Sequence, residues 1–170
     1  MAKVLNIIST LLVVMAVILA LLLVIPGFFG VNTYVVLSGS MEPEFETGSL
    51  LYTTENVNVE ELEVGDAITF KAGESTIVTH RIIEIVNDDG QLKFQTKGDA
   101  NEVPDANLVP SESVIGKALF DVPGLGYLAD FIHQPPGLYF AVAIGVLLIA
   151  FVFISDMFVE DDKKVKNQRK

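Results

Sequence analysis

The sequence contains no cysteine and no tryptophan, and only two histidines occur among its 170 residues. Without cysteine there can be no disulfide bond, no cysteine nucleophile and no zinc site with cysteine ligands. Basic residues are also scarce, because 11 Lys and Arg stand against 22 Asp and Glu, giving a formal net charge of −11. A chain this acidic repels phosphate groups, so we expect no binding to nucleic acid.

Long uncharged segments, in contrast, are prominent. Residues 4–25 and 137–155 contain no charged side chain over 22 and 19 residues, close to the roughly 20 that a helix needs to cross the hydrocarbon layer. The mean hydropathy of +0.49 agrees with a membrane component. We expect 4–25 to be an N-terminal transmembrane signal anchor and 137–155 a C-terminal transmembrane helix. A cleaved signal peptide is disfavoured, because its apolar core is usually shorter and no small-residue cleavage motif follows here.

Residues 27–136 are numerous enough for a compact domain of their own. They include 18 acidic and 5 basic residues, whereas Lys3 precedes the first apolar segment and five basic residues lie in the tail 156–170. By the positive-inside rule, both termini are cytoplasmic and the acidic domain lies outside. We therefore predict a multi-pass protein of the cell membrane with an extracytoplasmic domain at 27–136 and a charged cytoplasmic tail at 156–170.

Short runs of β-branched residues separated by turn residues predict that the domain is mainly antiparallel β-structure. The longest run is 76–86, and the Asn-Asp-Asp-Gly turn at 87–90 predicts a hairpin whose second strand is 91–96. Other strands are expected at 34–37, 48–53, 67–70 and 113–121. Apolar residues at helical spacing over 125–132 predict a short amphipathic helix. The predicted fold is thus a mainly β domain flanked by two transmembrane helices.

The segment Ser-Gly-Ser-Met-Glu-Pro at 38–43 has the composition of a turn that presents a serine. Gly39 relaxes the backbone and Pro43 restricts it, so Ser40 can be held on a tight turn at the end of a predicted strand. A serine in such a position can act as a nucleophile if a base lies within hydrogen-bond reach. The same residue types also occur in ordinary surface turns.

Histidine is the natural candidate for that base. His80 lies within the long predicted strand 76–86, whereas His133 precedes two prolines at the membrane boundary. The ordinary imidazole pKa, about 6.5, suits a base that works near neutral pH. Asp99 and Asp105 follow the returning strand, and either carboxylate could orient an imidazole. Each of these residues alone is equally consistent with a structural role.

Four sequence blocks occur in a characteristic order: Ser-Gly-Ser-Met-x-Pro at 38–43, Gly-Asp-x-Ile-x-Phe at 65–70, Thr-His-Arg-Ile at 79–82 and Lys-Gly-Asp at 97–99. Together they resemble the type I signal peptidases of the archaeal and endoplasmic-reticulum branch, which includes some Gram-positive sporulation-associated enzymes. In that branch histidine replaces the lysine base of the ordinary bacterial enzymes. The resemblance implies a β-rich serine endopeptidase that removes signal peptides from secreted preproteins beside the outer membrane face.

The resemblance also implies roles for individual residues. Ser40 matches the nucleophile, His80 the general base, Asp105 the acid of the triad and Asp99 a second important acid. Ser38 and the backbone N–H of Ser40 match the donors of the oxyanion hole. No metal or organic cofactor is expected. The expected partners are preproteins that carry signal peptides, membrane lipid and the secretion translocon.

One position departs from the family pattern, because Ala100 stands where these enzymes usually have asparagine. The chain has two other interpretations. A membrane-anchored, non-catalytic β module for adhesion or complex assembly would have no reactive serine. A self-cleaving peptidase with a Ser/Lys pair is disfavoured by the two apolar segments and by His80 at the position where the lysine should be.

Overall fold

The computed structural model describes residues 2–55, 57–88 and 90–168. Contacts between residues divide the chain into two units. One unit is Pro26–Asp130, and the other joins Met1–Ile25 with Phe131–Lys170.

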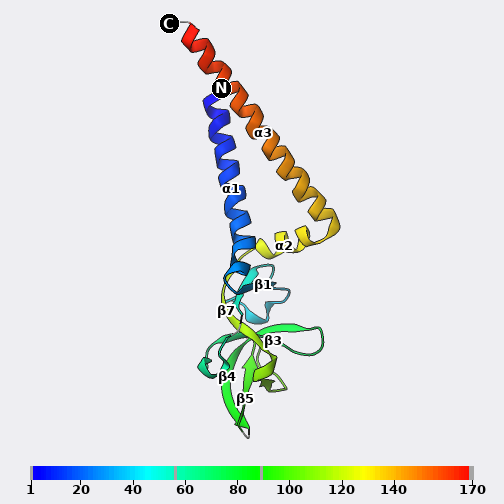
Figure 1. The fold of residues 1–170 in the computed structure, drawn as a ribbon. Coiled ribbons are helices and arrows are strands. Elements are labelled where there is room, and N and C mark those ends of the chain that lie inside the picture. Colours follow the sequence, from blue (N-terminus) through cyan, green and yellow to red (C-terminus); the bar gives the residue numbers. More distant parts are fainter. Residues whose placement is uncertain (1, 56, 89, 169–170) are drawn as a thin grey trace. The chain divides into compact units, whose positions relative to one another are not determined.

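Within the described part of Pro26–Asp130, the strands form one seven-stranded antiparallel sheet (Figure 1). The order across the sheet is β1-β2-β7-β3-β4-β5-β6. The strands are β1 (Val31–Val35), β2 (Leu50–Thr54), β3 (Ala67–Lys71), β4 (Ile77–Asp88), β5 (Gln91–Lys97), β6 (Val109–Pro110) and β7 (Val114–Val122). Strand β7 pairs with β2 through its C-terminal half and with β3 through its N-terminal half, so it joins the two parts of the sheet.

The predicted fold class is confirmed, since antiparallel strands occupy most of the region expected to be β. The hairpin of β4 and β5 is the longest pairing in the sheet and is drawn in green in Figure 1. Strand β1 begins three residues earlier than predicted and ends at Val35. Its pairing is nevertheless continued by Val36, which bonds to Ser49 and Gly48 through its N–H and its carbonyl. The two-residue strand β6 was not predicted.

Two clusters of buried side chains form the core of this unit. The first contains Leu62, Ile68, Phe70, Ile82, Phe94 and Val109. The second contains Met41, Phe45, Leu51, Ala67 and Ala118. Full burial of a large apolar side chain contributes roughly 1.5–3 kcal/mol, so the second cluster firmly anchors the segment that follows Ser40.

The α-helices of the described residues are α1 (Ala2–Phe28), α2 (Leu125–His133) and α3 (Pro135–Gln168). The short helix expected at 125–132 is confirmed by α2. Within the described residues, Ile7–Phe28 and Pro135–Ser155 are long and apolar enough to cross a membrane, and few of their residues are buried. These two candidate spans agree with the predicted apolar segments, while the boundaries of the membrane and cytoplasmic regions remain predictions.

Candidate active site

Ser40 lies in a single 3-10 turn, η1 (Gly39–Met41), between β1 and β2. Met41 is only 3% exposed, and its carbonyl accepts a hydrogen bond from the N–H of Phe45, which is also buried. The turn is therefore fixed to the core through the residue after Ser40, while Ser40 itself is only partly buried. This is the arrangement expected for a serine that is held rigidly and presented to a ligand.

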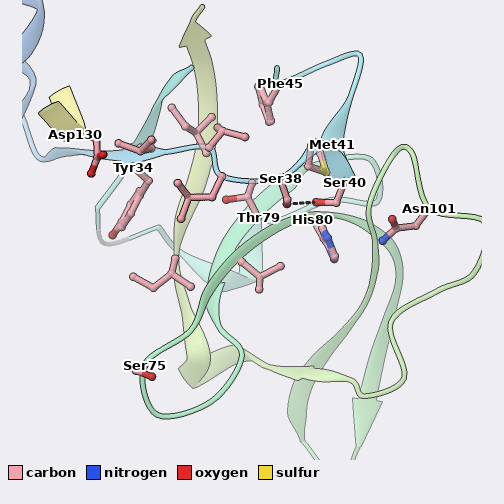
Figure 2. A pocket seen from close by; sticks show the side chains of 16 residues that line it. Tyr34, Ser38, Ser40, Met41, Phe45, Ser75, Thr79, His80, Asn101 and Asp130 are labelled. Atoms are coloured by element: carbon pink, nitrogen blue, oxygen red, sulfur yellow. Dashed lines mark hydrogen bonds between the residues drawn. The ribbon is translucent and has the colours of Figure 1, made fainter. Parts of the chain in front are cut away.

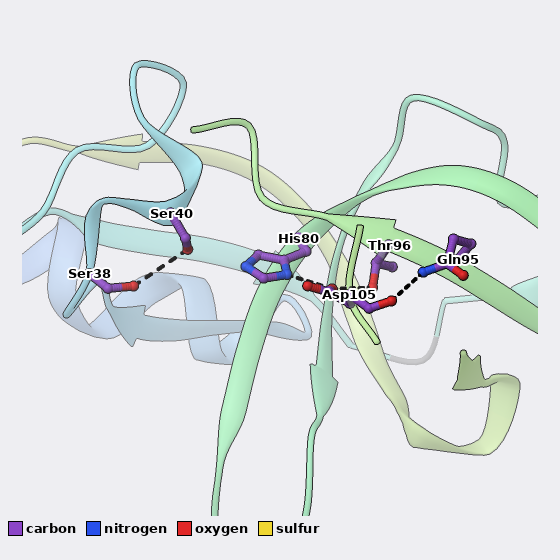
Figure 3. Close-up of polar contacts among 6 residues, drawn as sticks. All are labelled: Ser38, Ser40, His80, Gln95, Thr96 and Asp105. Atoms are coloured by element: carbon purple, nitrogen blue, oxygen red, sulfur yellow. Dashed lines mark hydrogen bonds and ion pairs between the residues drawn. The ribbon is translucent and has the colours of Figure 1, made fainter. Parts of the chain in front are cut away.

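Ser38 approaches the same hydroxyl from the preceding extended segment. Its Oγ lies 3.4 Å from the Oγ of Ser40, and either group could donate the hydrogen bond (Figure 3). The backbone of Ser38 is extended, with φ −137° and ψ 157°, and its side chain is exposed. The two hydroxyls therefore face the same region of solvent.

His80 lies in β4 opposite Ile68 of β3 and is 8% exposed. Its Nδ1 is 2.7 Å from Oδ2 of Asp105. Figure 3 shows the second ring nitrogen, Nε2, on the side of the ring where Ser40 lies. An imidazole that donates from Nδ1 to a carboxylate keeps Nε2 free as an acceptor, which is the tautomer that a general base needs.

Asp105 is positioned by strand β5. The Oγ1 of Thr96 donates to the Oδ2 of Asp105 at 2.6 Å. The backbone N–H of Asp105 donates to the carbonyl of Thr96, and the side-chain amide of Gln95 donates to the carbonyl of Asp105 at 2.7 Å. Three hydrogen bonds to two adjacent residues of β5 thus hold this carboxylate in place beside His80.

Asp99 is bound to a different residue. Its carboxylate makes a bidentate pair with Arg81, at 2.8 Å from Nε and 2.5 Å from Nη2. Arg81 also donates to the carbonyl of Gly65, and the hydrogen bond from its guanidinium to Asp99 raises the pKa of Arg81. Because His80 and Arg81 are consecutive in a strand, they point to opposite faces of the sheet. The two candidate carboxylates therefore lie on opposite faces of β4.

The loop that contains Asp99 touches the backbone of Ser40. The N–H of Ala100 donates to the carbonyl of Ser40 at 2.9 Å. Gly98 is buried, and a Cβ atom at this position would lie 2.6 Å from the same carbonyl. The Ala100 contact uses only the backbone, and its side chain is exposed, so the missing asparagine leaves this contact intact. A side chain at 98 would force this loop or the serine turn to shift, which favours glycine at this position.

Ser38, Ser40 and His80 line one pocket of about 610 Å³ (Figure 2). The extended segment 34–38 and residues 77–80 at the start of β4 also line it. Asp105 does not line this pocket; together with His80 it lines a second cavity of about 330 Å³. The structure therefore brings Ser38, Ser40, His80 and Asp105 into one connected group and leaves Asp99 outside it. No group of three or more candidate metal ligands is found among the described side chains.

Sequence reasoning assigned no role to four further residues of this region. Thr96 orients Asp105, Arg81 binds Asp99, Gly98 leaves space for the serine turn, and Asn101 lines the pocket. Arg81 and Gly98 belong to blocks quoted above, so the sequence contained a signal for them. Asn101 stands at the last position of the family pattern Lys-Gly-Asp-Asn-Asn, from which Ala100 departs, so the sequence contained a signal for it too. Thr96 gave no signal beyond its proximity to the Lys-Gly-Asp block.

A family model described as "Signal peptidase, peptidase S26" matches residues 7–94. The chain belongs to this family. Among similar proteins, "Signal peptidase I W" of Bacillus subtilis is 49% identical over 89 residues, which are 52% of this chain and 47% of that protein. The rat protein "Signal peptidase complex catalytic subunit SEC11C" is 36% identical over 129 residues, 71% of this chain and 66% of that protein.

A third similar protein, "Signal peptidase complex catalytic subunit SEC11" of Colletotrichum graminicola, is 30% identical over 126 residues, 69% of this chain and 73% of that protein. The matched segments thus span about half to three quarters of the length of these relatives. The resemblance to the signal peptidases is therefore confirmed by sequence relationship.

Proposed function

We propose that the chain is a membrane-bound serine endopeptidase that removes signal peptides from secreted preproteins. The observation that carries the proposal is the hydrogen bond between His80 and Asp105, with Ser40 in the same pocket as His80. Membership of the peptidase S26 family supports the reaction and the substrate class. No step of this reaction calls for a metal or an organic cofactor.

In the first half of the reaction, the Oγ of Ser40 attacks the carbonyl carbon of the scissile peptide bond while Nε2 of His80 takes the hydroxyl proton. Asp105 stabilises the imidazolium that results. The negative charge on the substrate oxygen is stabilised by the backbone N–H of Ser40 and the hydroxyl of Ser38. The C–N bond then breaks, and His80 gives its proton to the departing amine, which is the new N-terminus of the mature protein.

The second half of the reaction returns the enzyme to its starting state. A water molecule attacks the ester carbonyl on Ser40 as His80 removes its proton. The ester bond breaks, the signal peptide leaves with a carboxylate, and Ser40 recovers its proton from His80. Atoms and protons balance, with one water consumed for each peptide bond cleaved.

The shape of the pocket supports an extended peptide as substrate. Its two walls are the extended segment 34–38 and the start of β4 at 77–80. An extended substrate chain that lies against such segments can add to them as another strand. Every second side chain of the substrate then points into the pocket, because side chains alternate along a strand. The apolar side chains of Met41, Phe45 and Leu51 line the floor beside Ser40, consistent with small uncharged residues before the cleavage site.

A membrane location brings the enzyme and its substrate together. We propose that the candidate spans Ile7–Phe28 and Pro135–Ser155 cross the cell membrane, with both termini in the cytoplasm and 27–136 outside. A signal peptide is itself an apolar segment in the same membrane, so the substrate reaches the site by diffusion in two dimensions. Preproteins emerge from the secretion translocon, and an association with it is part of the proposal.

The alternative Ser/Lys mechanism has no support in the geometry. Lys93 and Lys117 are paired with Asp88 and Asp66, and none of the described lysines lines the pocket that contains Ser40. A non-catalytic β module would not need the ordered contacts of His80 with Asp105.

Incubation of the full chain, reconstituted into liposomes, with a purified preprotein tests the proposal. Wild type should release a mature protein whose new N-terminus follows a small residue, with another small residue two positions earlier. The Ser40→Ala variant should release none. No cleavage by wild type, at a level of reconstituted folded protein that gives a clear signal with a known signal peptidase, would support the non-catalytic alternative instead.

A further inference from the structure

Asn101 lies next to the candidate catalytic residues without belonging to them. It lines the pocket together with Ser40 and His80. Figure 2 shows its carboxamide turned toward Ser40 and His80, while Ser38 lies on the other side of Ser40. In this view Ser40 lies between a hydroxyl and an amide that line the same pocket.

The position of Asn101 is fixed through its backbone. Its N–H donates to the carbonyl of Gly98 at 3.0 Å, and its carbonyl accepts a hydrogen bond from Nζ of Lys97 at 3.3 Å. The preceding residue, Ala100, bonds to the carbonyl of Ser40. Because the backbone is held in this way, the side chain has a defined place relative to the Ser40 turn.

The carboxamide itself is unused. Within residues 2–55, 57–88 and 90–168, no hydrogen bond to the side-chain amide of Asn101 is found. The absence of a side chain at Gly98 makes space for it, since a Cβ there would lie 2.7 Å from Nδ2 of Asn101. A partly buried amide that lines a pocket and has free donors and an acceptor is suited to bind a peptide main chain.

We propose that the Asn101 side chain binds the main chain of the substrate just after the scissile bond, in the part that becomes the mature protein. This inference rests on the proposed function. The oxyanion donors, Ser38 and the N–H of Ser40, define the side of Ser40 toward which the substrate carbonyl oxygen points. Asn101 lies on the opposite side of Ser40 from Ser38, where the leaving amine and the residues after it must pass. Its amide N–H donates to a carbonyl of that segment, whatever the side chains of the mature protein are.

Two peptides with the same residues before the cleavage site test this role. One continues for five residues of mature sequence, and the other ends at the scissile carbonyl as a 4-nitrophenyl ester. With the full chain in liposomes, Asn101→Ala should lower kcat/KM for the extended peptide about tenfold, the effect of one lost hydrogen bond. It should leave kcat/KM for the ester within a factor of two. Asn101→Asp, which replaces the donor by a charged acceptor, should lower kcat/KM for the extended peptide further, and Asn101→Gln should restore part of it.

Equal losses with both peptides would overturn the inference, because they would assign Asn101 to the oxyanion or to the support of the Ser40 turn. Unchanged kcat/KM for the extended peptide would overturn it as well. Asn58→Ala is the matched control, since Asn58 caps the distant turn η2 (Val59–Glu61) and does not line the pocket; it should leave both rates unchanged. Failure of the wild type to cleave either peptide would instead overturn the proposed function, and the inference with it.

Discussion

The Nδ1 of His80 lies 2.7 Å from a carboxylate oxygen of Asp105. The neighbouring residue in the strand, Arg81, carries its own carboxylate partner, Asp99, on the opposite face. One strand therefore supports two acid–base pairs with separate tasks. The pair with Asp105 serves the imidazole, and the pair with Asp99 holds the loop whose backbone contacts Ser40.

Replacement of each aspartate by asparagine should separate these tasks. Asp105→Asn should lower kcat/KM for preprotein cleavage by about 10²- to 10⁴-fold, because the amide cannot stabilise the imidazolium and favours the wrong tautomer. Asp99→Asn should lower the free energy of unfolding by about 1–3 kcal/mol, because a hydrogen bond to a charged group is lost. Cleavage rates and thermal unfolding of the same protein preparations measure both effects.

The opposite pattern would reverse the assignment of these acids. It would consist of a wild-type rate for Asp105→Asn together with an inactive Asp99→Asn variant of normal stability.

Gly98→Ala should impair cleavage without unfolding the domain. The added methyl group would lie 2.6 Å from the carbonyl of Ser40, so either the loop or the serine turn must move. A displacement of a nucleophile by a fraction of an ångström to 1 Å costs about 10- to 100-fold in rate. The control is Gly27→Ala, where no atom lies within 4 Å of the new methyl group. Equal activity of the two variants would show that the contact between the loop and Ser40 is unimportant.

Asp66 should make the stability of the domain depend on pH. Burial raises its pKa, but the hydrogen bonds from Lys117 and from the N–H of Glu63, together with the positive charges of Lys117 and Arg81, outweigh burial, so the pKa of Asp66 is lowered. A carboxyl group whose pKa is lower in the folded than in the unfolded state binds fewer protons when folded, so stability rises with pH. The contribution is present above the ordinary pKa of about 3.9 and is lost as the pH falls through the lowered value.

Asp66→Asn should therefore shift the denaturation midpoint downward at pH 7, and the difference from wild type should shrink as the pH falls below about 4. Denaturant titrations of the full chain in detergent, at pH 7 and at pH 3, measure the difference between the two midpoints. The matched control is Asp88→Asn, because the pair of Asp88 with Lys93 is at the surface and should matter little. A difference between wild type and Asp66→Asn that is the same at pH 7 and pH 3 would contradict the role of this charge.

The orientation in the membrane leads to a separate prediction. Because the Lys and Arg residues outside 27–136 are concentrated near the termini, protease added to right-side-out vesicles should cleave the domain at the 87–90 turn and spare the tail. In inverted vesicles the tail should be cut first. Mass spectrometry of the fragments identifies the cut sites. Loss of the tail in right-side-out vesicles would contradict the proposed location of the active site.

Local sequence patterns were sufficient for much of this fold. The hairpin of β4 and β5 was predicted from a run of β-branched residues and a strong turn. Both apolar helices were predicted from the length of the two uncharged segments. Strand β6, only Val109–Pro110, has too few residues for any periodicity and contains proline. It forms because β5 offers an edge to which Val109 can pair while its side chain joins the core.

The candidate site was harder to derive from the residues alone. Family blocks pointed to Ser40, His80 and the two aspartates, but spacing along the chain could not decide which aspartate faces the histidine. That choice depends on the alternation of His80 and Arg81 and on the way the loop after β5 folds back onto Thr96. Contacts between residues distant in sequence, such as that of Gly98 with Ser40, leave no periodic pattern that a single sequence can reveal.

Labelling with an acylating probe for serine nucleophiles tests the central claim, that Ser40 is a nucleophile activated by His80. The full chain in liposomes is incubated with the probe at neutral pH, digested, and analysed by mass spectrometry. We expect one modified site, at Ser40, together with a labelling rate that falls at least about 10²-fold in His80→Ala, because the hydroxyl loses its base. Labelling of another serine, or labelling of Ser40 at the same rate in wild type and His80→Ala, would contradict it.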